Sequence, residues 1–274
     1  MTDSFDNSWR PLSAELSLQR SGLHDLNLTI GSRNTCSSYR MKGLKDVTKH
    51  LARSRTLNVH SESLWEIREI LDLVFRHCVP EHMSQLSLRF LSKDEEPDHR
   101  TSEQDVFNHM DSPLRPYLIR ALHSLSSLRI SNICLEWEPA MFSARLVELR
   151  VDTIRFAGDS AVTAFLTALS SAEELRDLKV ISVEAFADQG SVLPQGSRIS
   201  LPKLQSLYLE DLYFNFTNAL PMSITPGSHR MTFNPSFKTT LNLLASSADP
   251  VAFGDTCLEH TIWPSQPTPI NADP

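Results

Sequence analysis

Apolar residues recur along this chain in a nine-residue pattern, LxxLxLxxΦ, where Φ is a large apolar residue. Four segments match it at every apolar position: Leu125–Ile133, Leu146–Ile154, Leu175–Val183 and Leu204–Leu212. Three earlier segments match it in part: Leu23–Leu28, Ser54–Val59 and Met83–Leu88. Self-similarity at a fixed period is the sequence signature of repeat architectures. The pattern therefore predicts a chain built from seven related units.

The second apolar position of the pattern returns at a nearly constant interval. It falls at positions 26, 57, 86, 128, 149, 178 and 207, so the successive differences are 31, 29, 42, 21, 29 and 29. The value that occurs three times lies at the upper end of the leucine-rich repeat range of about 20–29 residues. Each LxL segment would place two apolar side chains on one face of a short strand, and neighbouring strands would bury that face by stacking.

These features predict an α/β fold, specifically a leucine-rich repeat solenoid, or horseshoe. Its short parallel strands would form the concave face, and helices or loops would form the convex face. The repeats are degenerate, because apolar residues occupy the ninth position, where such repeats usually carry Asn or Cys. The alternative is a set of ordinary amphipathic strands in another α/β fold, which would not require a constant interval.

Helical spacing of apolar residues between these strands predicts three helices. The first covers residues 64–78 and is stopped by Pro80. The second has Ser112 as its N-cap and Pro113 as its first residue, and the third has Asp159 or Ser160 as its N-cap. The short step from position 128 to position 149 leaves little room for a helix, so a loop or short turn is expected there.

The pattern also divides the chain. Residues 1–22 are predicted to be an N-terminal segment or cap, and residues 23–216 the repeat solenoid. Residues 217–274 are predicted to be a degenerate cap followed by a disordered tail, because eight of the 16 prolines lie there. Met231–Phe233 is a candidate for one further degenerate repeat.

Composition excludes several classes of function. With 26 Lys and Arg against 33 Asp and Glu, the net charge is -7, which disfavours nucleic acid and anionic membrane surfaces as partners. No apolar run is long enough to span a bilayer, and no signal peptide is apparent, so an intracellular protein of the cytoplasm or nucleus is expected. The four cysteines are isolated, and neither they nor the ten histidines show metal-ligand spacing, so no metal or cofactor is expected.

Trp9 and the segment Arg20-Ser21-Gly22, followed by the strand-like Leu26–Ile30, resemble fungal F-box-like proteins with leucine-rich repeats. The resemblance covers roughly residues 9–215. It implies a non-catalytic protein-interaction module, like the substrate-recognition part of an F-box/leucine-rich repeat ubiquitin-ligase receptor. The alternative is an enzyme, a hydrolase whose site is not visible as motifs, although no catalytic residue can be named.

The N-terminus departs from this family. Only eight residues precede Trp9, fewer than an F-box occupies. The chain as given is therefore expected not to bind the adaptor of a cullin-based ligase unless an F-box is supplied.

The middle residues of the LxL segments are predicted to point out of the concave face toward a protein partner. They are Asn27, Asn58, Ser87, Arg129, Arg150, Lys179 and Tyr208. The last four, named here the contact row, are the predicted partner-binding residues. Acidic residues flank them at positions 148, 152, 177 and 210, which favours a partner of complementary charge. The alternative is a solvated face whose ion pairs contribute little to stability.

Overall fold

A computed structural model of the chain describes residues 25–31, 48–77, 82–91, 113–156, 158–185, 199–212, 220, 223–225 and 230–234. The chain divides into two units, Met1–Asn234 and Pro235–Pro274, and all described residues lie in the first. The predicted N-terminal cap and the predicted tail after residue 234 lie outside the described residues.

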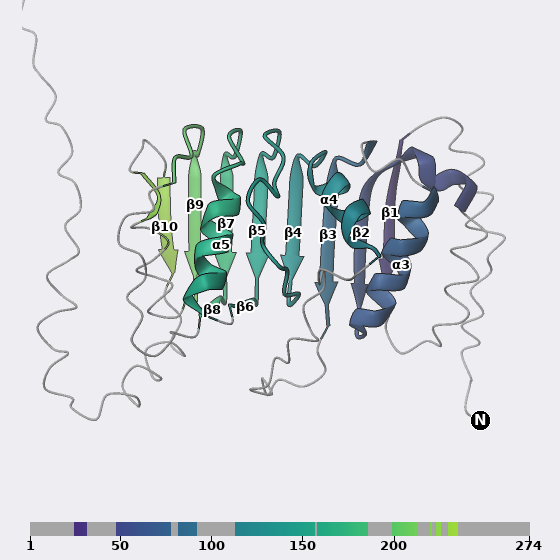
Figure 1. Cartoon of the computed structure of the whole chain (residues 1–274), viewed down its shortest axis with the longest axis horizontal. Helices are drawn as coiled ribbons and strands as arrows, with labels where there is room; N and C mark the ends of the chain where they lie inside the picture. The colour runs from purple at the N-terminus through teal and green to yellow at the C-terminus, as the bar shows by residue number, and fades with distance from the viewer. Residues whose placement is uncertain are drawn as a thin grey trace, which may run out of the picture. The chain divides into compact units, whose positions relative to one another are not determined.

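Eight parallel strands form one open sheet, and their order in the sheet follows their order along the chain (Figure 1). The strands are β1 (Leu26–Gly31), β2 (Ser54–Ser61), β3 (Gln85–Phe90), β4 (Ser127–Ser131), β5 (Glu148–Asp152), β7 (Asp177–Ile181), β9 (Ser206–Glu210) and β10 (Arg230–Asn234). Strands β1 and β10 are the two edges. The predicted α/β class with parallel strands is confirmed.

The apolar pattern supplies the core of this sheet. All sixteen apolar positions of the four complete copies are at most 5 % exposed. Because side chains alternate along a strand, the two apolar residues of each LxL segment lie on the same face, as Leu149 and Val151 do on β5. Each such residue contributes about 1.5–3 kcal/mol by leaving water.

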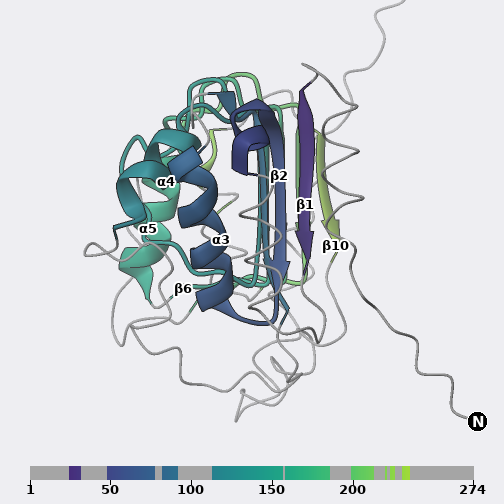
Figure 2. The same ribbon diagram turned by 90° about the vertical axis from the view of Figure 1, so that its right-hand side faces the viewer.

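Helices cover only one face of the sheet in the described part of the chain (Figure 2). They are the 3-10 helix η1 (Thr48–Arg53) and the α-helices α3 (Leu64–His77), α4 (Arg115–Leu122) and α5 (Asp159–Leu169). Parallel strands require crossover connections, and these helices belong to such connections. The opposite face is named here the open face. Strands β1 and β10 lie displaced from the central strands, away from the helices, so the sheet bends with its open face on the inside.

Two helix starts differ from the prediction. Helix α4 begins at Arg115 with Leu114 as its N-cap, and Pro116 lies in its first turn. A start at Pro113 would place Pro116 deeper in the helix, where the missing N–H group and the ring disfavour it. Helix α5 has Gly158 as its N-cap, and Asp159 is its first helical residue. A carboxylate in a first turn also meets the positive end of the helix, so its presence does not identify the cap.

The segment between β4 and β5 forms no helix, as the short interval predicts. Apolar side chains of this segment fill the space that a helix would occupy, and Trp137, Met141 and Phe142 are all buried. The ring of Trp137 meets that of Phe165 on α5 edge-on, with centroids 4.9 Å apart. Aromatic packing therefore joins this loop to the neighbouring helix.

A left-handed residue follows each of four successive strands. Asn132, Thr153, Ser182 and Asp211 have φ between 50° and 55°. Each donates its backbone N–H to the carbonyl of the last residue of the next strand, at 2.9–3.1 Å. The residue after each one is the buried Φ position of the pattern. After the second and third of these turns, β6 (Arg155–Phe156) pairs with β8 (Glu184–Ala185) in a small second sheet.

The register of β1 corrects the first predicted repeat. Leu28 pairs with Leu57 and Thr29 with Asn58, so the predicted alignment through Leu26 and Asn27 is wrong by two residues. A shift of two residues leaves the same side chains on the same face, so the alternation of apolar residues could not distinguish the two registers. With this correction, the first interval equals the one from Leu57 to Leu86.

The sheet continues beyond residue 216. Strand β10 pairs with β9 and aligns Met231 with Leu207 and Phe233 with Leu209. All five residues of β10 are exposed, and Met231 and Phe233 are 54 % and 47 % exposed. The LxL alignment thus extends into this stretch without the burial that accompanies it elsewhere.

Candidate functional site

The contact row forms a continuous line across four neighbouring strands of the open face. Strand pairing aligns Arg129 on β4 with Arg150 on β5, Arg150 with Lys179 on β7, and Lys179 with Tyr208 on β9. Adjacent strands lie about 4.8 Å apart, so each of these residues is the nearest neighbour of the next. On the other side of Arg129 the line continues through Ser87, Asn58 and Thr29. Thr29 takes the place predicted for Asn27.

Carboxylates on both sides of the contact row bind its side chains. Glu148 forms an ion pair with Arg129, with 3.0 Å between Oε1 and Nη2. Asp152 forms one with Arg150, with 3.0 Å between Oδ2 and Nη2. The hydroxyl of Tyr208 donates a hydrogen bond to Glu210 Oε2 at 2.9 Å. These contacts fix the long side chains of the row without removing them from solvent, since the side chains of Arg129 and Arg150 remain 54 % and 41 % exposed.

The pKa of Glu148 is lowered from its ordinary value near 4.5. Partial burial alone would raise it. That effect is outweighed by the hydrogen bond and charge of Arg129, the hydrogen bond from Ser127 and the charge of Lys179. Glu148 is therefore a carboxylate at neutral pH and lies between two cations of the contact row.

Lys179 differs from the two arginines beside it. Within the described residues, its ammonium group has no hydrogen-bond or ion-pair partner, and neither has the carboxylate of Asp177 on the same strand. Both side chains are half-buried. The middle of the open face thus presents one cation and one anion, two residues apart, that remain available to an incoming group.

The open face over β1–β3 has a different character. Its middle positions carry the short polar side chains of Thr29, Asn58 and Ser87, and Asn58 Nδ2 donates to Thr29 Oγ1 at 3.4 Å. The longer side chains of His60 and Arg89 lie at the far ends of β2 and β3. Long and charged side chains are therefore concentrated over β4–β9.

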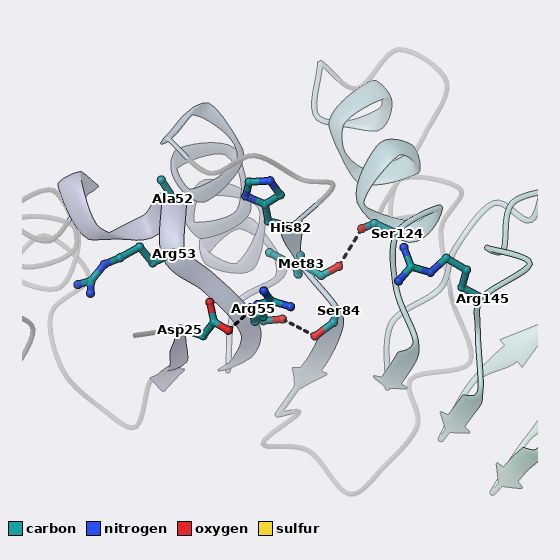
Figure 3. A pocket seen from close by; sticks show the side chains of 9 residues that line it. All are labelled: Asp25, Ala52, Arg53, Arg55, His82, Met83, Ser84, Ser124 and Arg145. Carbon is teal, nitrogen blue, oxygen red and sulfur yellow. Dashed lines mark hydrogen bonds and ion pairs between the residues drawn. The ribbon is translucent and has the colours of Figure 1, made fainter. Parts of the chain in front are cut away.

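A cavity of about 280 Å³ lies away from the contact row, at the end of the sheet where the first strands begin (Figure 3). We name it the edge cavity. Its lining residues are Asp25, Ala52, Arg53, Arg55, His82, Met83, Ser84, Ser124 and Arg145. The sequence pattern did not reveal this site because its residues come from segments that are far apart in the sequence. Their shared position near the start of a strand was the only available signal.

The edge cavity contains Ser, His and Asp residues, but their contacts are not those of a catalytic triad. Ser84 Oγ donates to the Arg55 carbonyl at 3.3 Å, and Ser124 Oγ donates to the Met83 carbonyl at 2.9 Å. Asp25 pairs with Arg55 at 2.7 Å, and within the described residues His82 makes no hydrogen bond to either serine. Nucleophilic catalysis needs a hydroxyl next to a base that a third group orients. This arrangement gives the hydrolase alternative no support.

In the part of the chain that the structure describes, no three His, Cys, Asp or Glu side chains are grouped so as to hold a metal ion. The helices described there are all too short or too polar to cross a membrane. Comparison of the chain with protein-family models, curated proteins and solved structures finds no match.

Proposed function

We propose that this chain is a non-catalytic protein-interaction module that binds a protein partner on its open face. One observation carries the proposal. The four residues of the contact row are paired with one another across four neighbouring strands, on a sheet face that no described helix covers. Arg and Tyr are enriched among the residues that dominate binding energy at interfaces. Arg129, Arg150, Lys179 and Tyr208 would make the central contacts.

The finer architecture that we propose is a degenerate leucine-rich repeat solenoid. Three features support it. Strand order follows chain order, four of the intervals between aligned leucines are identical, and the same left-handed turn follows four successive strands. Solenoids commonly bind partners on their concave surface, which here corresponds to the inside of the bent sheet.

Charge and size favour a protein as the occupant. Eight strands at about 4.8 Å spacing span about 34 Å, a length suited to an interface of about 800 Å² per partner. Cations and carboxylates alternate across the face, so a uniformly charged polymer would meet repulsion as well as attraction. A folded protein or peptide of mixed charge can pair with both Lys179 and Asp177.

By its resemblance to F-box-like proteins, we propose that the module corresponds to the substrate-recognition part of an F-box/leucine-rich repeat ubiquitin-ligase receptor. The partner would then be a substrate protein inside the cell. Docking to a cullin-based ligase would require an F-box, and the interaction itself would require no cofactor.

A pair of matched triple variants tests the proposal. Arg150→Ala, Lys179→Ala and Tyr208→Ala together remove the centre of the contact row. Arg76→Ala, Tyr117→Ala and Lys203→Ala remove the same three residue types elsewhere, at exposed or largely exposed sites on α3, on α4 and before β9. Both variants should retain the parent's circular dichroism spectrum and melting temperature, because the substituted side chains point away from the core.

The readout is capture of cellular proteins by the tagged chain under crosslinking, followed by measurement of Kd with the purified partner. We expect the contact-row variant to bind at least 100-fold more weakly, since central residues dominate affinity. The control variant, with Ala at positions 76, 117 and 203, should bind within 3-fold of the parent. A partner that binds the contact-row variant as tightly as the parent would overturn the proposed site.

A further inference from the structure

The edge cavity concentrates positive charge in a chain whose net charge is -7. Three arginines and a histidine line it, and Asp25 is the one carboxylate among its described lining residues. Anions are the natural ligands of such a site, because a group of cations in one concave surface raises the local positive potential whatever the net charge.

Two arginines and a histidine from separate segments lie around the cavity. Figure 3 shows Arg55 at the start of β2, His82 just before β3, and Arg145 in the segment before β5, whereas the side chain of Arg53 extends away from these three. His82 and Arg145 are exposed, and their side chains have no hydrogen-bond or ion-pair partner within the described residues. Arg55 shares its charge with Asp25 in a pair whose side chains are both 59 % exposed.

The hydroxyl groups of the cavity contribute less to ligand binding than its cations. Ser84 and Ser124 already donate their protons to backbone carbonyls, and Ser124 also reaches the Ala121 carbonyl at 2.7 Å. Binding energy for a ligand would therefore come from the guanidinium groups of Arg55 and Arg145. Guanidinium groups bind phosphate through paired, charge-assisted hydrogen bonds.

We propose that the edge cavity binds a small phosphate-bearing anion, either free phosphate or a soluble phosphomonoester. Its volume of about 280 Å³ lies just below the roughly 300–1,000 Å³ of pockets for drug-sized ligands. The proposed ligand is therefore small. Arg145 and His82 bind it directly, and Arg55 exchanges its contact with Asp25 for one with the ligand. This site is separate from the open face and does not depend on the function proposed for it.

The test is isothermal titration of the full chain with three probes at constant ionic strength: inorganic phosphate, O-phosphoserine and serine. We expect saturable binding of at least one of the first two and no binding of serine. Preference for O-phosphoserine identifies a phosphomonoester site, and preference for inorganic phosphate a free-anion site. The proposal is overturned if neither phosphate probe shows saturable binding. If the chain then floats with vesicles that contain phosphatidylinositol phosphate, the site binds a lipid headgroup and not a soluble anion.

Three variants locate the binding. Arg145→Ala should weaken the affinity at least 10-fold, because it removes an exposed arginine that Asp25 does not neutralise. Arg176→Ala, at an exposed arginine before β7 that does not line the cavity, is the matched control and should leave the affinity unchanged. Asp25→Asn should tighten binding several-fold, since it releases Arg55 and removes a negative charge. Equal losses in Arg145→Ala and Arg176→Ala, or weaker binding in Asp25→Asn, would refute the site.

Discussion

Leu149 and Leu178 pair across β5 and β7, and neither is exposed to solvent. Leu149→Asp or Leu178→Asp should lower the free energy of unfolding by several kcal/mol, because either places an unpaired charge in the core. Since domains are stable by only about 5–15 kcal/mol, a melting temperature far below the parent's is expected. The neighbouring Arg150→Ala should change stability by less than about 0.5 kcal/mol. An unchanged melting temperature in either Asp variant would show that the strand register is wrong.

Ser54 occupies an apolar position of the pattern and carries a buried hydroxyl with no hydrogen-bond partner within the described residues. Ser54→Ala should therefore raise the free energy of unfolding by about 1 kcal/mol, because it removes an unsatisfied polar group from the core. Ser61→Ala provides the contrast, since the hydroxyl of Ser61 donates to the buried carboxylate of Glu66. Urea unfolding should show Ser61→Ala to be destabilised. A loss of stability in Ser54→Ala would show that the Ser54 hydroxyl does have a hydrogen-bond partner.

Glu148 makes stability depend on pH. Its pKa is lower in the folded chain than the ordinary value near 4.5, so the folded state favours the carboxylate. The resulting stabilisation is fully present above about pH 4.5 and is lost as the pH falls through the folded-state pKa. In urea unfolding below pH 4.5, Glu148→Gln and Arg129→Ala should both show a shallower loss of stability than the parent. Slopes identical to the parent's would show that Arg129 does not lower this pKa.

At the scale of single elements, the turns after the strands carry strain that the sequence can relieve. Thr153 has φ of 53°, a conformation that β-branched residues rarely adopt. The equivalent residue after β4 is Asn132, a type that tolerates this region well. Thr153→Asn should raise the free energy of unfolding by about 1 kcal/mol. Thermal unfolding measures this, and Asn132→Val should shift the melting temperature in the opposite direction.

Strands were more predictable from sequence than helix starts. The four complete copies of the pattern determined the strand positions because burial selects Leu, Ile or Val at every second residue. Helix α3 was also predicted within one residue of its observed end. The start of α4 depended on the competition between Pro113 and Pro116 for the first turn, which the apolar spacing does not report. Likewise, the edge strand β1 offered three apolar residues on one face, and only pairing with β2 selects Leu28.

The candidate site was predictable to the same extent. The contact row follows from the strand register, because each of its residues stands between two buried ones. The register does not determine which of these cations are paired, because pairing depends on side-chain rotamers. Arg129 and Arg150 reach carboxylates, whereas Lys179 reaches none among the described residues. The edge cavity was not found from the sequence, since Arg55, His82 and Arg145 are distant in sequence and share only a position near the start of a strand.

For the molecule as a whole, each strand of the large sheet pairs only with its immediate neighbours in the order, so stability should vary from the centre of the sheet to its edges. Hydrogen exchange monitored by mass spectrometry should find the slowest amides in β4, β5 and β7. Strand β10, whose residues are all exposed, and the half-exposed β1 should exchange fastest. Protection of β10 equal to that of β5 would mean that another chain covers this edge in solution.

The equal spacing from Leu149 to Leu178 and from Leu178 to Leu207 has a consequence for how such a chain can grow. A tandem duplication of residues 149–177 would insert one more strand of sequence Asp-Leu-Arg-Val-Asp, together with its own copy of α5. Its ends would meet the same neighbours that β5 and β7 already present to each other. Gene duplication could thus lengthen the partner surface by about 4.8 Å, and by one arginine, in a single event.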